Sequence, residues 1–311
     1  MEPGGAGCRY QDDQLTPSQP LVITAALTGG APRKGPAHPV TPEAVMADAI
    51  AAWRAGAAIV HLHARTADGG TTMAPAAYRS MVTAIRHGGC EAVIDLSAGD
   101  DGGKADHAAR LAVIESGGEL VTLACGPFNL GGRLYDNSPG FVDRMAQAIA
   151  ATASKPILEV FDTGQMATLN RLLAEGALVP PVMVEFVMGV PGGMPVDLKL
   201  LPVLIERLPA GALWSISIQT HDPVAFRAIQ RQVILHGGHV RTGLEDHVFD
   251  AKGGPVAGNA ALVAEAVVVA RSLGREIATA DQARRLLGLP ALPSVDVQPR
   301  HGSGANRDRG A

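Results

Sequence analysis

The segment TPEAVMADAIAAWRAGAAIVHLH, residues 41–63, holds one complete unit of the pattern that decides the fold. Thr41 is suited to cap a helix that has Pro42 in its first turn. Gly56 stands where that helix should end, because glycine easily takes the left-handed backbone of a helix terminus. The apolar run after it is typical of a buried strand. The segment therefore predicts a helix over 42–55 followed by a strand over 58–64.

The same alternation of helical spacing and short apolar runs continues along the chain. Further strands are predicted over 21–27, 92–97, 120–125, 156–161, 182–188, 213–219 and 239–245, and further helices over 75–87, 105–117, 141–153, 166–176, 196–208, 224–236 and 258–273. Strands joined by helices run parallel. Eight of them at this length favour a closed α/β architecture, the (β/α)8 TIM barrel, in a single catalytic domain over 19–290.

An open doubly wound sheet is the structural alternative. Such a sheet usually carries a glycine-rich dinucleotide turn after its first strand. Residues 28–32 read TGGAP, which is not that turn, so the barrel is favoured. The polar ends, 1–18 and 291–311, are expected to be disordered because they offer too little apolar surface to bury.

Composition narrows the functional classes. Of the 311 residues, 47% are hydrophobic and 18% are charged, which is ordinary for a globular protein. The net charge of -4 gives no basic surface for nucleic acid, and no apolar run reaches the ~18 residues of a membrane span. Three cysteines without a CxxC motif, and no recognisable secretory signal, favour a reduced, cytoplasmic setting.

The most informative motif is His61-Leu62-His63, at the end of the second predicted strand. Residues two apart in a strand share a face, so both imidazoles project together. Glu245 ends the last predicted strand, and barrel closure places that strand beside the first, which itself neighbours the second. Two histidines and a glutamate make an open metal site of the catalytic type. Zinc is the first choice for these ligands, with manganese, cobalt or iron as alternatives.

Polar residues near these ligands indicate proton transfer. Asp246 adjoins Glu245, and Arg241 lies within reach to pair with a carboxylate through its rigid fork. An arginine-oriented aspartate near a metal is suited to be a general base; a structural ion pair at the barrel rim is the alternative. Glu185, in the strand predicted over 182–188, has the same two interpretations. The glycine-rich segment 189–194 favours a ligand-binding loop over a simple turn.

Five motifs together resemble those of the β-keto acid cleavage enzymes. They are TAALTG (24–29), HLHAR (61–65), DLSAG (95–99), FVMGVPGGM (186–194) and GHVRTGLED (238–246). The segment 278–284 is similar to the family's closing helix, so the resemblance covers residues 20–290. It implies a (β/α)8 barrel with zinc or another divalent metal. It also implies condensation of a 3-keto acid with acetyl-CoA, which gives acetoacetate and a new acyl-CoA.

The resemblance also implies roles for single residues. His61, His63 and Glu245 would hold the metal, and Asp246 would be the base that Arg241 orients. The substrate-binding residues would be Ser97, Gly99, Thr122 and Glu159. The loop 189–194 would lie near the thioester. The family further implies a homo-oligomer, with a tetramer as one form.

The chain departs from the family pattern at four positions, Ala31, Asp100, Ala124 and His247. Ala31 replaces a glutamate that meets a substrate ammonium in the amino-keto acid members, and Arg33 and Lys34 lie in the same loop. An ammonium buried without a partner is costly, whereas Arg33 would pair with a carboxylate by two hydrogen bonds. We therefore expect a substrate whose distal group is neutral or anionic.

Three other functions fit parts of the pattern. Amidohydrolase-like hydrolases also carry HxH in a barrel, but on the first strand and with histidines on strands five and six, which have none here. A metal-dependent aldol or Claisen lyase would need no acetyl-CoA. A non-catalytic metal-binding barrel would hold metal without turnover.

Overall fold

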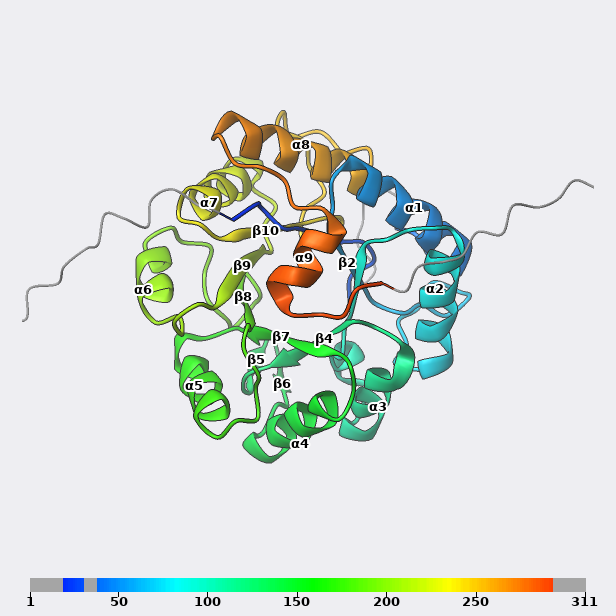
Figure 1. Ribbon diagram of the computed structural model, residues 1–311, viewed down its shortest axis with the longest axis vertical. Coiled ribbons are helices and arrows are strands. Elements are labelled where there is room, and N and C mark those ends of the chain that lie inside the picture. Colours follow the sequence, from blue (N-terminus) through cyan, green and yellow to red (C-terminus); the bar gives the residue numbers. More distant parts are fainter. Residues whose placement is uncertain (1–18, 31–37, 293–311) are drawn as a thin grey trace, which may run out of the picture.

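The computed structural model describes residues 19–30 and 38–292, and within them eight parallel strands close into a barrel (Figure 1). Around the ring they are β1 (Ile23–Ala26), β2 (Ile59–Leu62), β3 (Val93–Leu96), β4 (Leu120–Ala124), β7 (Lys155–Val160), β8 (Met183–Met188), β9 (Leu213–Ile218) and β10 (His239–Thr242). Parallel pairing of β10 with β1 closes the ring, with Val240 opposite Ile23. The predicted (β/α)8 barrel is confirmed.

The helices form an outer layer around this ring (Figure 1). They are α1 (Pro42–Ala55), α2 (Pro75–His87), α3 (His107–Ala112), α4 (Pro139–Ala150), α5 (Met166–Ala174), α6 (Leu200–Glu206), α7 (Pro223–Leu235) and α8 (Asn259–Ser272). The caps of α1 are those expected from the sequence. The Thr41 side chain accepts a hydrogen bond from the Ala44 amide at 3.2 Å, and Gly56 ends the helix with a φ of 121°.

A final helix, α9 (Ala280–Leu287), covers one end of the barrel (Figure 1). Its Ala283 and Leu287 pack against Val22, Ile59 and Leu120, which lie near the N-terminal ends of the strands. Thr279 begins this helix with a capping box. Because α9 seals the N-terminal end, the C-terminal ends of the strands are the open end of the barrel.

Several predicted boundaries differ from the structure; the helix expected over 105–117, for example, is α-helical only over His107–Ala112 and continues as a 3-10 helix to Ser116. Two further differences have a clear local reason. The helix expected over 196–208 begins only at Leu200, because the Asp197 side chain accepts a hydrogen bond from the Lys199 amide and holds a turn before it. The strand expected over 239–245 ends at Thr242. Gly243 follows with a φ of 145°, where a Cβ would lie 2.2 Å from a backbone oxygen. Glu245 therefore lies in a turn beyond β10.

One element was not predicted at all. A short antiparallel hairpin, β5 (Phe128–Leu130) and β6 (Arg133–Tyr135), lies between β4 and α4. The glycine pair 131–132 between the two strands is a typical hairpin signal. Its strands are too short to stand out against the eight-unit pattern.

Several predictions concern residues outside the described part of the chain. These are the disorder expected for 1–18 and for 291–311, of which only 291 and 292 are described, and the roles expected for Ala31, Arg33 and Lys34. Among the described residues, no helix is both long and apolar enough to cross a lipid bilayer.

Candidate active site

A cavity of about 320 Å³ opens at the C-terminal ends of the barrel strands. Its lining includes His63, after β2, and Ser97, after β3. It also includes Glu159 in β7 and Glu185 in β8. The polar residues that the sequence singled out therefore gather in one place, at the end of the barrel where TIM-barrel sites form.

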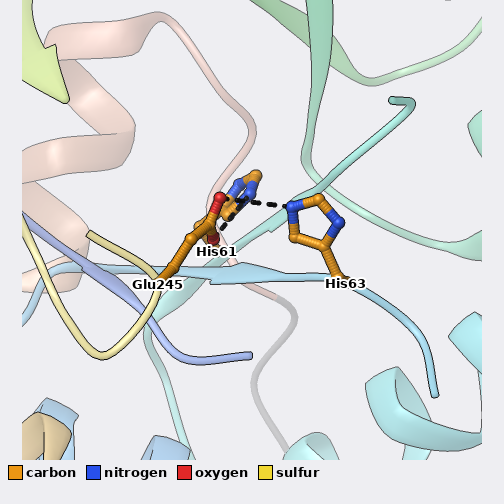
Figure 2. Close-up of side chains that lie close together, drawn as sticks. All are labelled: His61, His63 and Glu245. Atoms are coloured by element: carbon orange, nitrogen blue, oxygen red, sulfur yellow. Dashed lines mark ion pairs between the residues drawn. The ribbon is translucent and has the colours of Figure 1, made fainter. Parts of the chain in front are cut away.

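His61, His63 and Glu245 converge at this end, with one ligand atom from each within 4.8 Å of the others (Figure 2). The Nε2 atom of His61 lies 3.5 Å from Oε2 of Glu245, and the Nε2 atom of His63 lies 3.3 Å from Oε1. The two imidazoles are nearly perpendicular, at 76°. The predicted meeting of the three side chains is thus found.

Backbone contacts fix where these side chains point. The hydroxyl of Thr28, just after β1, accepts a hydrogen bond from the His63 amide at 2.6 Å and donates one to the His63 carbonyl at 2.9 Å. The Glu245 amide donates to the Ala26 carbonyl at 3.3 Å. The end of β1 therefore fixes the positions of the backbone at His63, after β2, and at Glu245, after β10.

Asp95, in β3, orients His61, and sequence reasoning gave it no role. Its Oδ2 lies 2.6 Å from Nδ1 of His61, and both side chains are buried. A carboxylate on Nδ1 leaves Nε2 of the same ring available to a metal, an arrangement common around metal-binding histidines. The signal was available, because Asp95 stands in an apolar strand and is in register with His61.

The donor set fits a divalent cation. Oε2 of Glu245 is buried and has no hydrogen-bond partner among the described residues. Burial alone would raise the pKa of Glu245, yet Arg241 and the two histidines hold it well below its usual range. Burial alone would lower the pKa of His61, but Glu245 and Asp95 raise it to about 9. An ionised carboxylate that faces two imidazoles, and has one oxygen that accepts no hydrogen bond from the described residues, is suited to bind zinc or a similar ion together with them.

Arg241 lies at the centre of three buried carboxylates. Its guanidinium contacts Glu185 at 2.7 Å, Glu245 at 2.7 Å and Asp246 at 3.0 Å. One positive charge against three carboxylates leaves this cluster anionic, which further favours a bound cation. Glu185 therefore has the ion-pair partner that one interpretation requires, and it lines the cavity; a role in the site stays a prediction.

Asp246 is held by several donors at once. In addition to the bonds from Arg241, its Oδ1 accepts hydrogen bonds from the Ser217 hydroxyl at 3.1 Å and from the side-chain amide of Gln219 at 2.6 Å. Asp246 is fully buried, whereas Ser217 and Gln219 line the cavity. These two residues, at the end of β9, were not identified from the sequence. They lie between the predicted base and the space where a substrate would bind.

The predicted substrate-binding residues fall into two groups. Ser97, Gly99 and Glu159 line the cavity. Thr122 is not part of that lining as far as the described residues show; its hydroxyl accepts a hydrogen bond from the Ala98 amide at 2.9 Å. It thereby supports the backbone between Ser97 and Gly99. A direct contact of Thr122 with substrate stays a prediction.

Burial raises the pKa of two carboxyl groups that line the cavity, Glu159 and Glu185. Burial and the neighbouring Glu185 raise the pKa of Glu159 to about 8. At neutral pH its carboxyl group is therefore mostly protonated and able to donate a hydrogen bond.

The loop 189–194 and the unpredicted hairpin pack together at the rim. The Gly131 amide donates to the Pro191 carbonyl at 2.9 Å, and Val190 and Leu130 both line the cavity. A Cβ at Gly192, which has a φ of 89°, would lie 1.6 Å from the Asn129 carbonyl oxygen. Glycine is required there because the two backbones touch.

Known proteins resemble this chain in sequence and in fold. The sequence profile of a family described as beta-keto acid cleavage enzyme matches residues 20–289. The 3-keto-5-aminohexanoate cleavage enzyme of Fusobacterium nucleatum is 35% identical over 272 residues, which cover 86% of this chain and 98% of that protein. The 3-oxoadipate:acetyl-CoA acetyltransferase of Cupriavidus necator is 34% identical over 280 residues, which cover 88% of this chain and 97% of that protein.

A solved structure shows the same fold. ObcA, in a ternary complex with a C4-CoA adduct and oxalate, is similar with a TM-score of 0.70 and 23% identity. The match covers 81% of this chain and 67% of that one. At this identity the likeness shows the barrel alone.

Proposed function

Because this chain belongs to the beta-keto acid cleavage enzyme family, we propose that it condenses a 3-keto acid with acetyl-CoA and releases acetoacetate and a new acyl-CoA. Family membership makes it an enzyme that transfers acyl groups and cleaves a carbon–carbon bond. The single observation that carries the proposal is the convergence of His61, His63 and Glu245 in the cavity at the open end of the barrel.

The reaction needs a proton to be removed from C2 of the 3-keto acid. A divalent cation held by His61, His63 and Glu245, zinc first among them, would act as a Lewis acid toward the keto and carboxylate oxygens. Asp246 is the proposed base. Because Ser217 and Gln219 line the cavity and hydrogen-bond Asp246, the Gln219 side chain must turn aside when substrate binds. Arg241 then keeps the carboxylate in place.

The remaining steps balance without a further reactant. The C2 carbanion attacks the thioester carbonyl of acetyl-CoA, and the coenzyme A thiolate leaves. The thiolate then attacks the original keto carbon, and the bond from that carbon to C2 breaks. C2 leaves as the carbanion of acetoacetate and takes back the proton from Asp246, while the original keto carbon becomes the new acyl-CoA. Ser97 and protonated Glu159 line the cavity, and in this proposal they would donate hydrogen bonds to the oxygens that gain negative charge.

The test is a coupled assay of the metal-loaded protein with acetyl-CoA and a panel of 3-keto acids. With acetyl-CoA labelled in the acetyl group, we expect the label in acetoacetate and an unlabelled acyl-CoA in equal amount. Cleavage that proceeds without acetyl-CoA would point to the lyase instead. Bound metal with no turnover across the panel would point to a non-catalytic barrel.

A further inference from the structure

The far side of the cavity is built by the hairpin that the sequence pattern did not predict. Leu130 and Arg133 line the cavity from this hairpin. Phe161, Val187 and Val190 complete an apolar wall beside them. If the keto and carboxylate oxygens face His63 and Glu245, as the proposed function requires, the rest of the substrate must run along this wall.

One ion pair interrupts the apolar wall. The Arg133 guanidinium forms two hydrogen bonds with the Asp100 carboxylate, one of them from NH2 to Oδ1 at 3.0 Å. Both residues line the cavity, and Asp100 is the more buried, with 12% of its side chain exposed against 32% for Arg133. A parallel two-bond pair is also the geometry with which arginine holds a substrate carboxylate. The Asp100 carboxylate therefore occupies the position that such a group would take.

We propose that Asp100 masks Arg133, and that this pair selects a 3-keto acid with an uncharged, largely apolar distal chain. A distal carboxylate would meet Arg133 only next to the like charge of Asp100. A distal ammonium would meet Asp100 only next to Arg133. Neither charged group gains enough from a pair that is already neutral to offset the loss of its hydration. An alkyl chain has no such cost and buries its surface against Leu130 and Phe161.

The inference rests on the proposed function and makes it more specific. Similar enzymes act on substrates of opposite distal charge, one with an amino group and one with a second carboxylate, by their names. An ion pair in the cavity lining, such as Asp100 with Arg133, can discriminate among such substrates by the charge of their distal group. Removing one partner of the pair should then unmask the other and change the choice.

The experiment uses Asp100→Asn, Arg133→Gln and the double variant of the metal-loaded enzyme. For each, kcat/KM is measured for three 3-keto acids of equal length that end in methyl, carboxylate or ammonium. We expect wild type to prefer the methyl substrate about 10-fold. Asp100→Asn should raise the carboxylate-to-methyl ratio about 10-fold, and Arg133→Gln the ammonium-to-methyl ratio about as much, a change worth ~1.4 kcal/mol. The double variant should return to the methyl preference.

Controls separate this inference from folding and from the proposed function. Arg171→Gln breaks single-bond ion pairs with Asp143 and Glu175, away from the cavity lining, and should leave every ratio unchanged. In Asp100→Asn and in the double variant, the backbone carbonyl of residue 100 can still accept hydrogen bonds from the Gly103 and Ala105 amides. Thermal unfolding checks that both variants stay folded.

The same panel is also measured for binding by calorimetry, so that the ratios of Kd do not depend on turnover. Absence of acetoacetate from every substrate would defeat the proposed function alone, because the binding ratios still test the pair. Ratios that stay within twofold of wild type in both single variants would overturn the masking. So would a wild type that prefers a charged substrate, or variants that change only the KM for acetyl-CoA.

Discussion

The two ends of the barrel each hold arginines against buried carboxylates, but with opposite balance. At the end closed by α9, Arg86 and Arg284 share one carboxylate, Glu119. At the open end, Arg241 alone faces three carboxylates. At the closed end two arginines share one carboxylate, and Arg86 also donates to the Cys90 and Ala92 carbonyls, whereas at the open end three carboxylates share one arginine beside a cavity.

The buried side-chain atoms that lack a hydrogen bond also differ between the two ends of the barrel. At the closed end, the NH1 atom of Arg284 makes no hydrogen bond within the described residues and lies 3.6 Å from the Asp281 carboxylate. At the open end, one of the buried atoms without a hydrogen bond among the described residues is Oε2 of Glu245, which lies 3.5 Å from Nε2 of His61. The comparison teaches that a buried charge cluster need not be a site. The one at the open end is the candidate site because its carboxylate oxygens face imidazole nitrogens beside a cavity.

The largest expected effect comes from removing a ligand at the open end. His61→Ala should lower bound metal from about one ion per chain to less than a tenth, and turnover by about 10³-fold or more, because the Lewis acid is lost. Elemental analysis measures the bound metal, and the acetoacetate assay measures turnover. His236→Ala is the matched control, since this exposed histidine precedes β10 at the closed end. Equal metal content in wild type and His61→Ala would remove the ligand assignment.

The next effect concerns the proposed base. Asp246→Asn should lower kcat by roughly 10²–10⁴-fold, the usual contribution of a general base, while the metal stays bound. The asparagine still accepts from Ser217 and Gln219, so the fold should hold. If more than about half of the wild-type turnover remains, Asp246 is the structural ion pair that the sequence left as its alternative, and the proton goes elsewhere.

At the closed end, substitution should act on stability instead. Glu119→Gln leaves Arg86 without a charged partner and leaves the buried Arg284 with only the exposed Asp281, 3.6 Å away. Because Glu119 is partly exposed, the expected loss is about 1–3 kcal/mol of unfolding free energy rather than the larger cost of a fully buried pair. Chemical denaturation measures this loss, and turnover at 25 °C should stay within about twofold of wild type. A large loss of turnover in a folded variant would show that the two ends are coupled.

The smallest effect is the pH response of the closed end. His239 begins β10 and accepts a hydrogen bond from the Val22 amide, and burial together with Arg275 lowers its pKa to about 3. In the unfolded chain His239 binds a proton as the pH falls through about 6.5, whereas in the folded chain it stays neutral until about pH 3. This part of the stability is thus complete above pH 6.5 and is lost as pH falls toward 3, at no more than about 1.4 kcal/mol per pH unit. His239→Asn keeps an acceptor, and its unfolding free energy should depend less on pH between 6.5 and 5. An unchanged slope would contradict the assignment.

The sequence alone determined the barrel and the chemistry of its ligands. Eight repeats of helix and strand signals leave few topologies, because parallel strands need helical crossovers and eight of them close on themselves. His61 and His63 share a face through the two-residue period of a strand, which is a local property. The ends of elements were less certain, since Gly243 and Asp197 ended or delayed them through contacts with particular neighbouring atoms.

Only the tertiary structure decided which side chains meet across strands and loops. Asp95 reaches His61 through the register of β2 with β3, and Gln219 reaches Asp246 across the end of β9. The pair of Asp100 and Arg133 depends on how a short hairpin folds over the cavity. No periodicity in the chain encodes these meetings, because they are set by strand stagger and loop packing. The reaction class was predicted from residues that the sequence displays, whereas the proposed choice of substrate depends on contacts that exist only after the barrel has closed.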